Sequence, residues 1–260
     1  MKDSLFTSLI LIILQFATSS RIECIFKMTN YHVLGIAYTC QFKDALNITS
    51  PDSFFIFSST GNHLDLKSYD DVLGLNAKNM KIQYFPKGLE LIFKNLKAID
   101  LQRNGLKELY QSDLKPFKGL VYLDLGVNDI EVLEDGVFDN NPHLEVISLY
   151  SNKIYQIDLH VFDSLSKLNY LVLDKNRCIN KSSRFDLLGV QEIIQNTKFM
   201  CQNSEFMKGR SMMQRRCSNH DDSSSLKIQL ESIEINLQNR ISELKQVVDE
   251  LKDCRCKMNL

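Results

Sequence analysis

Four copies of one 24-residue pattern, seven cysteines and a C-terminal heptad pattern predict the fold class of this chain. The predicted fold is an α/β, horseshoe-shaped solenoid of leucine-rich repeats with disulfide-linked caps and a C-terminal coiled-coil helix. The expected organisation is a signal peptide over 1–20, an N-terminal cap over 21–70, repeats over 71–177, a C-terminal cap over 178–202, a linker over 203–225 and the coiled-coil helix over 226–254.

The repeat reads L-x-x-L-x-L-x-x-N-x-L, and its asparagine recurs with a constant spacing at Asn104, Asn128, Asn152 and Asn176. A period of 20 to 29 residues with this pattern is typical of leucine-rich repeats. The x-Leu-x-Leu portion predicts a short strand whose leucines point inward. Asparagines stacked from coil to coil predict a ladder that satisfies buried backbone amides. Because one coil cannot bury its apolar face alone, stability is expected to come from stacking.

A less regular unit precedes these four copies. Leu73, Leu75 and Asn79 echo the strand and the asparagine with one extra residue, which predicts an irregular first repeat. Residues 52–66 contain a further apolar run, which leaves open whether they form another degenerate repeat.

The start of the chain predicts secretion. Lys2 precedes an apolar run, Leu5–Phe16, and the small residues Ala17–Ser20 follow it, which is the pattern of a secretory signal cleaved near Ser20. The run is too short to span a membrane as a helix, and no later run is long enough. Two glycosylation acceptors, Asn47 and Asn180, agree with an extracellular, secreted protein.

In an oxidising compartment the cysteines are expected to form disulfides. Cys24 and Cys40 flank an apolar stretch, which predicts a β-hairpin cap closed by their bond. Cys178 and Cys201 flank an amphipathic stretch, which predicts a helical cap closed at the other end. Cys217 is an alternative partner for either, because sequence alone does not determine connectivity.

The C-terminal segment predicts a second chain as partner. Its apolar positions follow a heptad, and leucine at d with β-branched residues at a favours a parallel two-stranded coil. The expected dimerisation residues are Leu230, Leu237, Ile241, Leu244, Val248 and Leu251. The number of cysteines is odd, so Cys217, Cys254 and Cys256 are candidates for interchain disulfides. A helix that folds back on the solenoid is the alternative, and sequence does not separate a homodimer from a heterodimer.

No pattern points to catalysis, a cofactor or a metal. The five histidines have no ligand spacing with one another or with cysteines, and no phosphate loop or nucleophile elbow occurs. The net charge of -1 argues against a nucleic-acid partner, which needs a concentrated positive surface.

Function is therefore expected on the concave face, where strand side chains point outward and can contact a protein partner. The predicted binding residues are Asp100, Gln102, Tyr122, Asp124, Ser148, Tyr150, Tyr170, Val172 and Asp174, with Ala98, Gly126 and Val146 in the same rows. Tyrosines suit recognition because they bury area with little loss of entropy.

The whole arrangement resembles the secreted leucine-rich-repeat immune proteins of mosquitoes and related insect proteins. The resemblance is carried by the signal, Cys24 with Tyr38-Thr39-Cys40, the Phe85-Pro86-Lys87-Gly88-Leu89 turn, the repeats, the cysteines after them and the heptads. It implies secretion into haemolymph, disulfide-linked dimers joined by the coil, and partnership with complement-like thioester proteins.

Two functional hypotheses follow. The first is a secreted binding protein of innate immunity that acts as a coil-linked dimer. The alternative is an extracellular adhesion or developmental signalling ligand on the same scaffold. A matrix protein that assembles through its coil is a third, structural possibility.

Overall fold

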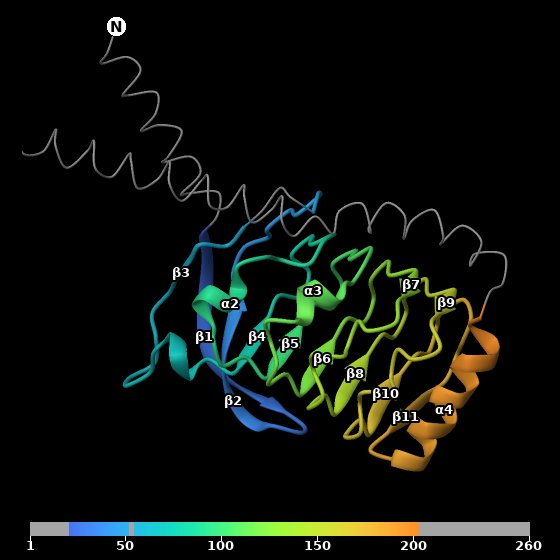
Figure 1. The fold of residues 1–260 in the computed structure, drawn as a ribbon. Coiled ribbons are helices and arrows are strands. Elements are labelled where there is room, and N and C mark those ends of the chain that lie inside the picture. Colours follow the sequence, from blue (N-terminus) through green and yellow to red (C-terminus); the bar gives the residue numbers. More distant parts are fainter. Residues whose placement is uncertain (1–20, 52–54, 203–260) are drawn as a thin grey trace, which may run out of the picture. The chain divides into compact units, whose positions relative to one another are not determined.

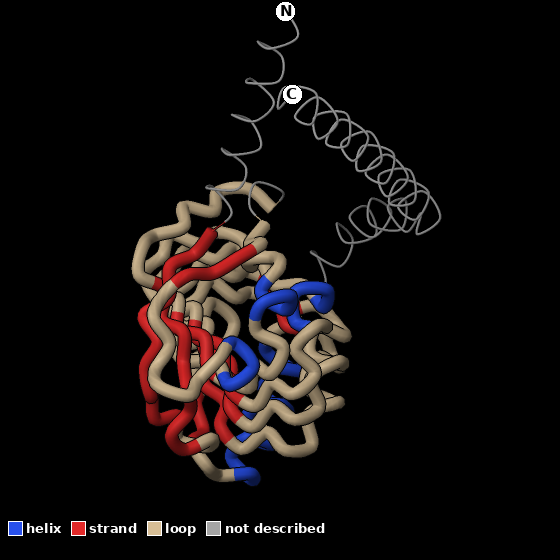
Figure 2. Tube along the Cα trace, turned by 90° about the vertical axis from the view of Figure 1, so that its left-hand side faces the viewer, coloured by secondary structure: helices blue, strands red, loops and turns tan. Residues whose placement is uncertain are grey.

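The computed structural model describes residues 21–51 and 55–202. The predicted signal peptide, the linker and the coiled-coil helix, with Cys217, Cys254 and Cys256, lie outside the described residues. Figure 1 shows the strands lying side by side along the chain, and Figure 2 shows the strands on one side of the described unit and short helices and loops on the other.

Within the described residues, nine strands form one sheet in the order β11-β10-β8-β6-β5-β4-β2-β1-β3. Its central strands are parallel, with one three-residue strand from each coil. These strands are β4 (Gly74–Asn76), β5 (Ala98–Asp100), β6 (Tyr122–Asp124), β8 (Val146–Ser148) and β10 (Tyr170–Val172). The middle residue of each strand is fully buried, and these residues are in register: Leu75, Ile99, Leu123, Ile147 and Leu171. The leucine period of the sequence therefore becomes one continuous core.

The opposite side of each coil closes the core with short elements. These are the 3-10 helix η1 (Tyr69–Asp71), the helices α2 (Leu89–Ile92) and α3 (Gln111–Leu114), and the paired strands β7 (Val132–Leu133) and β9 (Gln156–Ile157). Phenylalanines from successive coils pack here; the Phe138 and Phe162 rings are stacked with centroids 6.0 Å apart. This side of each coil therefore supplies the core with large apolar side chains, which the three-residue strands are too short to provide.

The predicted asparagine ladder is present. Asn128 Nδ2 donates to the carbonyls of Leu125, in its own coil, and Leu101, in the coil before, while its Oδ1 accepts the Asn104 N–H. Asn152 and Asn176 make the same pair of donations one and two coils later. Each side-chain amide thus joins two coils, and the Leu101, Leu125 and Leu149 carbonyls each accept from two successive asparagines.

The first repeat is regular, and the prediction of an extra residue in it is wrong. Leu75 pairs with Ile99, so the equivalent of Asn104 is Met80, 24 residues earlier, rather than Asn79. Asn79 is exposed and has a positive φ of 58°, as Arg103 does in the next coil. The inward positions are Val72, Leu75, Ala77 and Ile82, all fully buried. The ladder therefore begins at Asn104, whose Oδ1 accepts the Met80 N–H at 2.6 Å.

The strand of the preceding coil comes from the N-terminal hairpin. The hairpin consists of β1 (Arg21–Tyr31) and β2 (Gly35–Phe42), and β2 pairs directly with β4. The described part of 52–66 adds no strand between them: β3 (Ser58–Thr60) pairs with the outer side of β1. These residues are therefore not a separate repeat.

Both predicted cap disulfides are present. Cys24–Cys40 joins β1 to β2, and both cysteines are buried in the core. Cys178–Cys201 ties the last coil to the end of α4 (Leu187–Met200). Between them lies β11 (Ser182–Arg184), which runs antiparallel to β10 and ends the row of parallel strands.

Helix α4 covers this end of the core. The Asp186 side chain caps its N-terminus by accepting the Leu188 N–H at 3.1 Å. Val190, Ile193 and Ile194 lie on one face at helical spacing and are buried. The cap therefore protects the apolar end that an open stack would expose. Within the described part of the chain, none of the helices is long and apolar enough to cross a membrane.

Candidate functional site

The first and third residues of each parallel strand face away from the core and form the strand face, which is the predicted concave surface. A cavity of about 290 Å³ lies on it. Five of the predicted binding residues line this cavity: Asp100, Tyr122, Asp124, Ser148 and Tyr170. The other four predicted residues do not line the cavity. Gln102 hydrogen-bonds to Asp124, and Val172 is only 3 % exposed. Tyr150 and Asp174 lie outside the cavity lining.

The N-terminal hairpin covers one edge of the strand face. Tyr31, at the end of β1, packs edge-on against Tyr122 of β6, with ring centroids 5.2 Å apart. Tyr31, Ala37 and Ala98 form a small apolar cluster there. The expectation that Ala98 and Val146 are exposed is therefore wrong, since both are almost fully buried.

The hairpin also reaches the other cap. The His32 ring stacks on Phe185, which follows β11, with centroids 4.2 Å apart. Phe185 in turn contacts Tyr170 of β10 at 5.0 Å. We call Tyr31, His32, Tyr122, Tyr170 and Phe185 the aromatic rim. The rim joins the two caps across the strand face and forms one wall of the cavity.

A glycine makes this closure possible. Gly74, in the first position of β4, lies beneath Tyr31 and Thr39. A Cβ at Gly74 would lie 2.5 Å from the Thr39 hydroxyl and 2.8 Å from two atoms of the Tyr31 side chain. Any side chain there would therefore displace the hairpin from the strand face.

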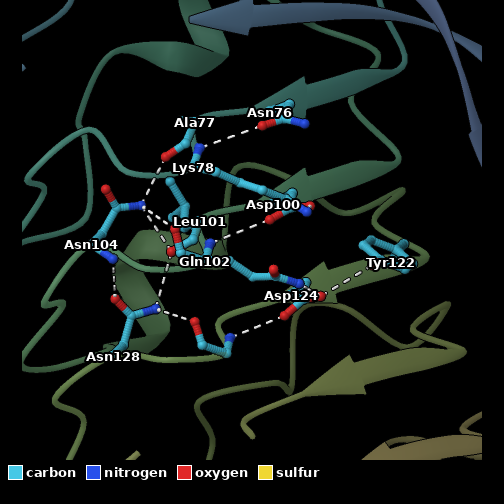
Figure 3. Close-up of polar contacts among 11 residues, drawn as sticks. Asn76, Ala77, Lys78, Asp100, Leu101, Gln102, Asn104, Tyr122, Asp124 and Asn128 are labelled. Carbon is cyan, nitrogen blue, oxygen red and sulfur yellow. Dashed lines mark hydrogen bonds and ion pairs between the residues drawn. The ribbon is translucent and has the colours of Figure 1, made fainter. Parts of the chain in front are cut away.

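The floor of the cavity carries two neighbouring carboxylates (Figure 3). Asp100 and Asp124 occupy the third positions of β5 and β6 and pair in register; they are 4 % and 5 % exposed. Lys78 Nζ lies 2.8 Å from Asp100 Oδ2. Asp124 accepts the Gly126 N–H through Oδ1, and the Gln102 amide and Tyr122 hydroxyl through Oδ2. The two acids are thus held rigidly in the sheet.

The two carboxylates perturb each other and their surroundings. Burial, and then the charge of Asp124, raise the pKa of Asp100 to about 6 despite the opposing effect of Lys78. Burial also raises the pKa of Tyr122, and both carboxylates add to this shift. For Tyr31, burial raises the pKa to about 12. The cavity therefore favours positive over negative charge.

Sequence reasoning missed the part of the site that the caps supply. Thr29, Asn30, Tyr31, His32 and Phe185 line the cavity, as do Asn76 and Lys78 of the first repeat. The hairpin was predicted, but nothing in its sequence shows which way its turn bends. Asn76 and Lys78 could have been found from the register, since they lie 24 residues before Asp100 and Gln102.

The described side chains do not form a cluster suited to binding a metal ion. Among residues 21–51 and 55–202, no group of three or more His, Cys, Asp or Glu side chains is placed to bind a metal ion.

Comparison with known proteins identifies the repeat. Residues 118–177 match the sequence model of the leucine rich repeat family. The fold is a leucine-rich-repeat solenoid. The coils at β6, β8 and β10, which carry much of the cavity floor, lie within the matched region.

One curated relative is the human Leucine-rich repeats and immunoglobulin-like domains protein 1, which is 36% identical over 81 residues. The match covers 31% of this chain and 7% of that protein. The matched segment therefore spans only a small part of the length of the human protein.

Two solved structures also resemble the solenoid. The Toll–Spatzle complex from Drosophila matches with 22% identity and a TM-score of 0.39, over 48% of this chain and 17% of that chain. The LRIM1/APL1C complex matches with 17% identity and a TM-score of 0.42, over 60% and 31%.

Proposed function

We propose that this chain is an extracellular protein-binding protein whose ligand docks on the strand face. The observation that carries the proposal is the cavity on that face, where the aromatic rim from two caps borders a charged floor from three repeats. Aromatic side chains around a concave polar centre are the composition that favours binding energy in protein interfaces. The disulfides Cys24–Cys40 and Cys178–Cys201 fit an oxidising, extracellular compartment.

Site-directed photo-cross-linking tests this proposal. A photoreactive amino acid replaces Tyr170 on the strand face or, as the matched control, Tyr110, which is 44 % exposed at the start of α3 on the opposite side. The full chain is incubated in extracellular fluid of the organism that makes it. We expect a defined protein adduct from position 170 and none from position 110. Adducts from position 110 alone would place binding on the wrong face.

We propose innate immune recognition as the biological role, on the resemblance carried by the signal, caps, repeats and heptads. The expected result is expression that rises on infection and a loss of defence on knockdown. Constant expression with unchanged defence would contradict this role. Tissue-restricted expression with a cell-surface receptor would instead support an adhesion or developmental ligand.

We further propose a secreted, disulfide-linked dimer joined through the heptads over 226–254, with glycans at Asn47 and Asn180. Both asparagines are exposed. Electrophoresis of the secreted protein with and without reductant tests the dimer. The expected band near twice the chain mass should collapse on reduction and be absent when Cys254 and Cys256 become Ser. A monomer under both conditions would contradict the coil-linked dimer.

A further inference from the structure

The cavity on the strand face contains more negative charge than the described residues neutralise. Lys78 forms an ion pair with Asp100. Among the described contacts, Asp124 accepts hydrogen bonds only from neutral groups of Gln102, Tyr122 and Gly126. A buried carboxylate without a cation is costly, and a like charge on the adjacent strand increases that cost. A cation entering the cavity would relieve both effects.

A second, independent observation comes from the hairpin. Tyr31 lines the cavity and is only 5 % exposed, and its hydroxyl interacts with the side chain of Thr39. The neighbouring Thr39 hydroxyl donates its own proton to the Ala37 carbonyl. The Tyr31 hydroxyl can therefore donate to Thr39, and its oxygen keeps lone pairs with which it can accept from a ligand. Like the carboxylates, a phenol oxygen can accept from a donor-rich group.

The shape and the walls limit the kind of ligand. Ligand pockets for drug-sized molecules run from roughly 300 to 1,000 Å³, so a cavity of about 290 Å³ suits one long side chain. Tyrosine rings at its wall can interact with a cation through their faces. This chain already makes such contacts nearby: Lys175 lies 5.1 Å from the Tyr150 ring centroid, and Arg184 lies 6.0 Å from that of Tyr170.

We propose that this cavity receives a single arginine or lysine side chain of the protein partner. The inference rests on the proposed function of the strand face and specifies its chemistry. The basic group lies between the aromatic rim and the floor, donates to Asp124 and offsets its charge. Arginine fits best, because its planar guanidinium both stacks on aromatic rings and donates several hydrogen bonds in fixed directions.

A pair of model compounds tests this proposal with the full secreted chain. N-acetyl-arginine methylamide and its neutral isostere N-acetyl-citrulline methylamide are compared by saturation-transfer NMR at pH 7.5. We expect the arginine compound to bind at least about 10-fold more tightly, since a charge-assisted hydrogen bond contributes roughly 1.5–3 kcal/mol. Equal binding of the two compounds, or binding of neither, would overturn the proposal.

Three variants assign the binding to the cavity. Asp124→Asn should weaken binding of the arginine compound about 10-fold, whereas Asp129→Asn should leave it unchanged, because Asp129 pairs with Lys153 outside the cavity. Lys78→Gln removes the internal cation and should strengthen binding several-fold. A gain of affinity cannot arise from misfolding, so weaker binding in Lys78→Gln would overturn the proposal even if Asp124→Asn folds poorly.

The outcomes also separate this inference from the proposed function. If position 170 still cross-links to a protein while the arginine compound does not bind, the strand face is a binding surface and the basic-side-chain pocket is refuted. If the arginine compound binds but cross-linking occurs only from position 110, the pocket exists and the proposed docking face is refuted.

Discussion

The asparagine ladder allows a quantitative prediction for Asn128→Ala. Asn128 Oδ1 accepts the N–H groups of Asn104, Gly105 and Leu106. The carbonyls of Leu101 and Leu125, to which its Nδ2 donates, also accept from Asn104 and Asn152 and keep a partner without it. A buried polar group left without a partner costs about 1–3 kcal/mol. Because the vacated space could admit a water, the lower value applies. Three N–H groups at this value predict a loss of about 3 kcal/mol.

The assay is equilibrium unfolding in guanidinium chloride with the disulfides intact, followed by circular dichroism. Asn196→Ala is the matched control, because this amide makes one exposed bond to Glu192 within α4 and alanine favours helix. We expect a change below about 0.5 kcal/mol for the control. Asn128→Leu should be at least as destabilising as Asn128→Ala, since leucine restores volume without hydrogen bonds. A loss below about 1 kcal/mol in both Asn128 variants would refute the role of the ladder.

Three further predictions concern the caps and the cavity. Gly74→Ala should destabilise the fold by about 1–3 kcal/mol and change the near-UV signal of Tyr31, because its Cβ would clash with the hairpin. Gly119→Ala, with open space around its Cβ, should do neither. Equal effects of the two substitutions would contradict the closure of the hairpin over Gly74. Stability should fall as pH rises from about 4 to 6, because Asp100, with a pKa raised to about 6, holds a proton that the unfolded chain has already lost. Burial also raises the pKa of Asp113 to about 6, and Asp113 acts in the same direction. Asp100→Asn should therefore reduce the slope of stability against pH without abolishing it. An unchanged slope, measured by urea titrations at several pH values, would contradict the assignment of this pH dependence to Asp100. Replacing Cys178 and Cys201 by Ser should cost about 3 kcal/mol of stability, from the freedom regained by the unfolded chain, and an unchanged unfolding midpoint would show that α4 closes the stack without the bond.

The parts of the fold that a local pattern determines could be predicted from the sequence. The strand leucines, the four ladder asparagines and both cap disulfides occupy the expected places. Each depends on spacing along the chain, and a repeat converts spacing directly into spatial neighbours. The polar ladder positions are especially informative, because a buried amide is tolerated only where its hydrogen bonds are satisfied.

The first repeat was misread because two signals competed. Asn79 suggested a ladder residue, but the 24-residue register places Met80 there and Asn79 in a left-handed position. Asparagine adopts that conformation more readily than most residues. The same residue type thus has two uses one position apart, and only the register of the buried positions separates them.

The candidate site could be predicted only in part, because half of it depends on tertiary closure. The floor residues Asp100, Asp124 and Ser148 follow from the strand period. The contacts of Tyr31 and His32 depend on how the hairpin bends over Gly74, and that of Phe185 depends on how the last coil turns. Contacts between segments some 90 and 150 residues apart leave no periodic trace in the sequence.

An N-linked glycan placed on the strand face tests most directly whether the partner binds there. Ser148→Asn together with Tyr150→Thr creates an Asn-Leu-Thr acceptor on the strand face, while Tyr110→Asn creates an Asn-Gln-Ser acceptor on the opposite side. The double variant Ser148→Gln, Tyr150→Thr lacks the acceptor and controls for the substitutions themselves. The measurement is recovery of the cross-linked extracellular partner by each glycosylated, folded protein. Loss of the partner only with the glycan at position 148 is the predicted result. Full recovery with that glycan, or loss with the glycan at position 110, would contradict binding through the strand face.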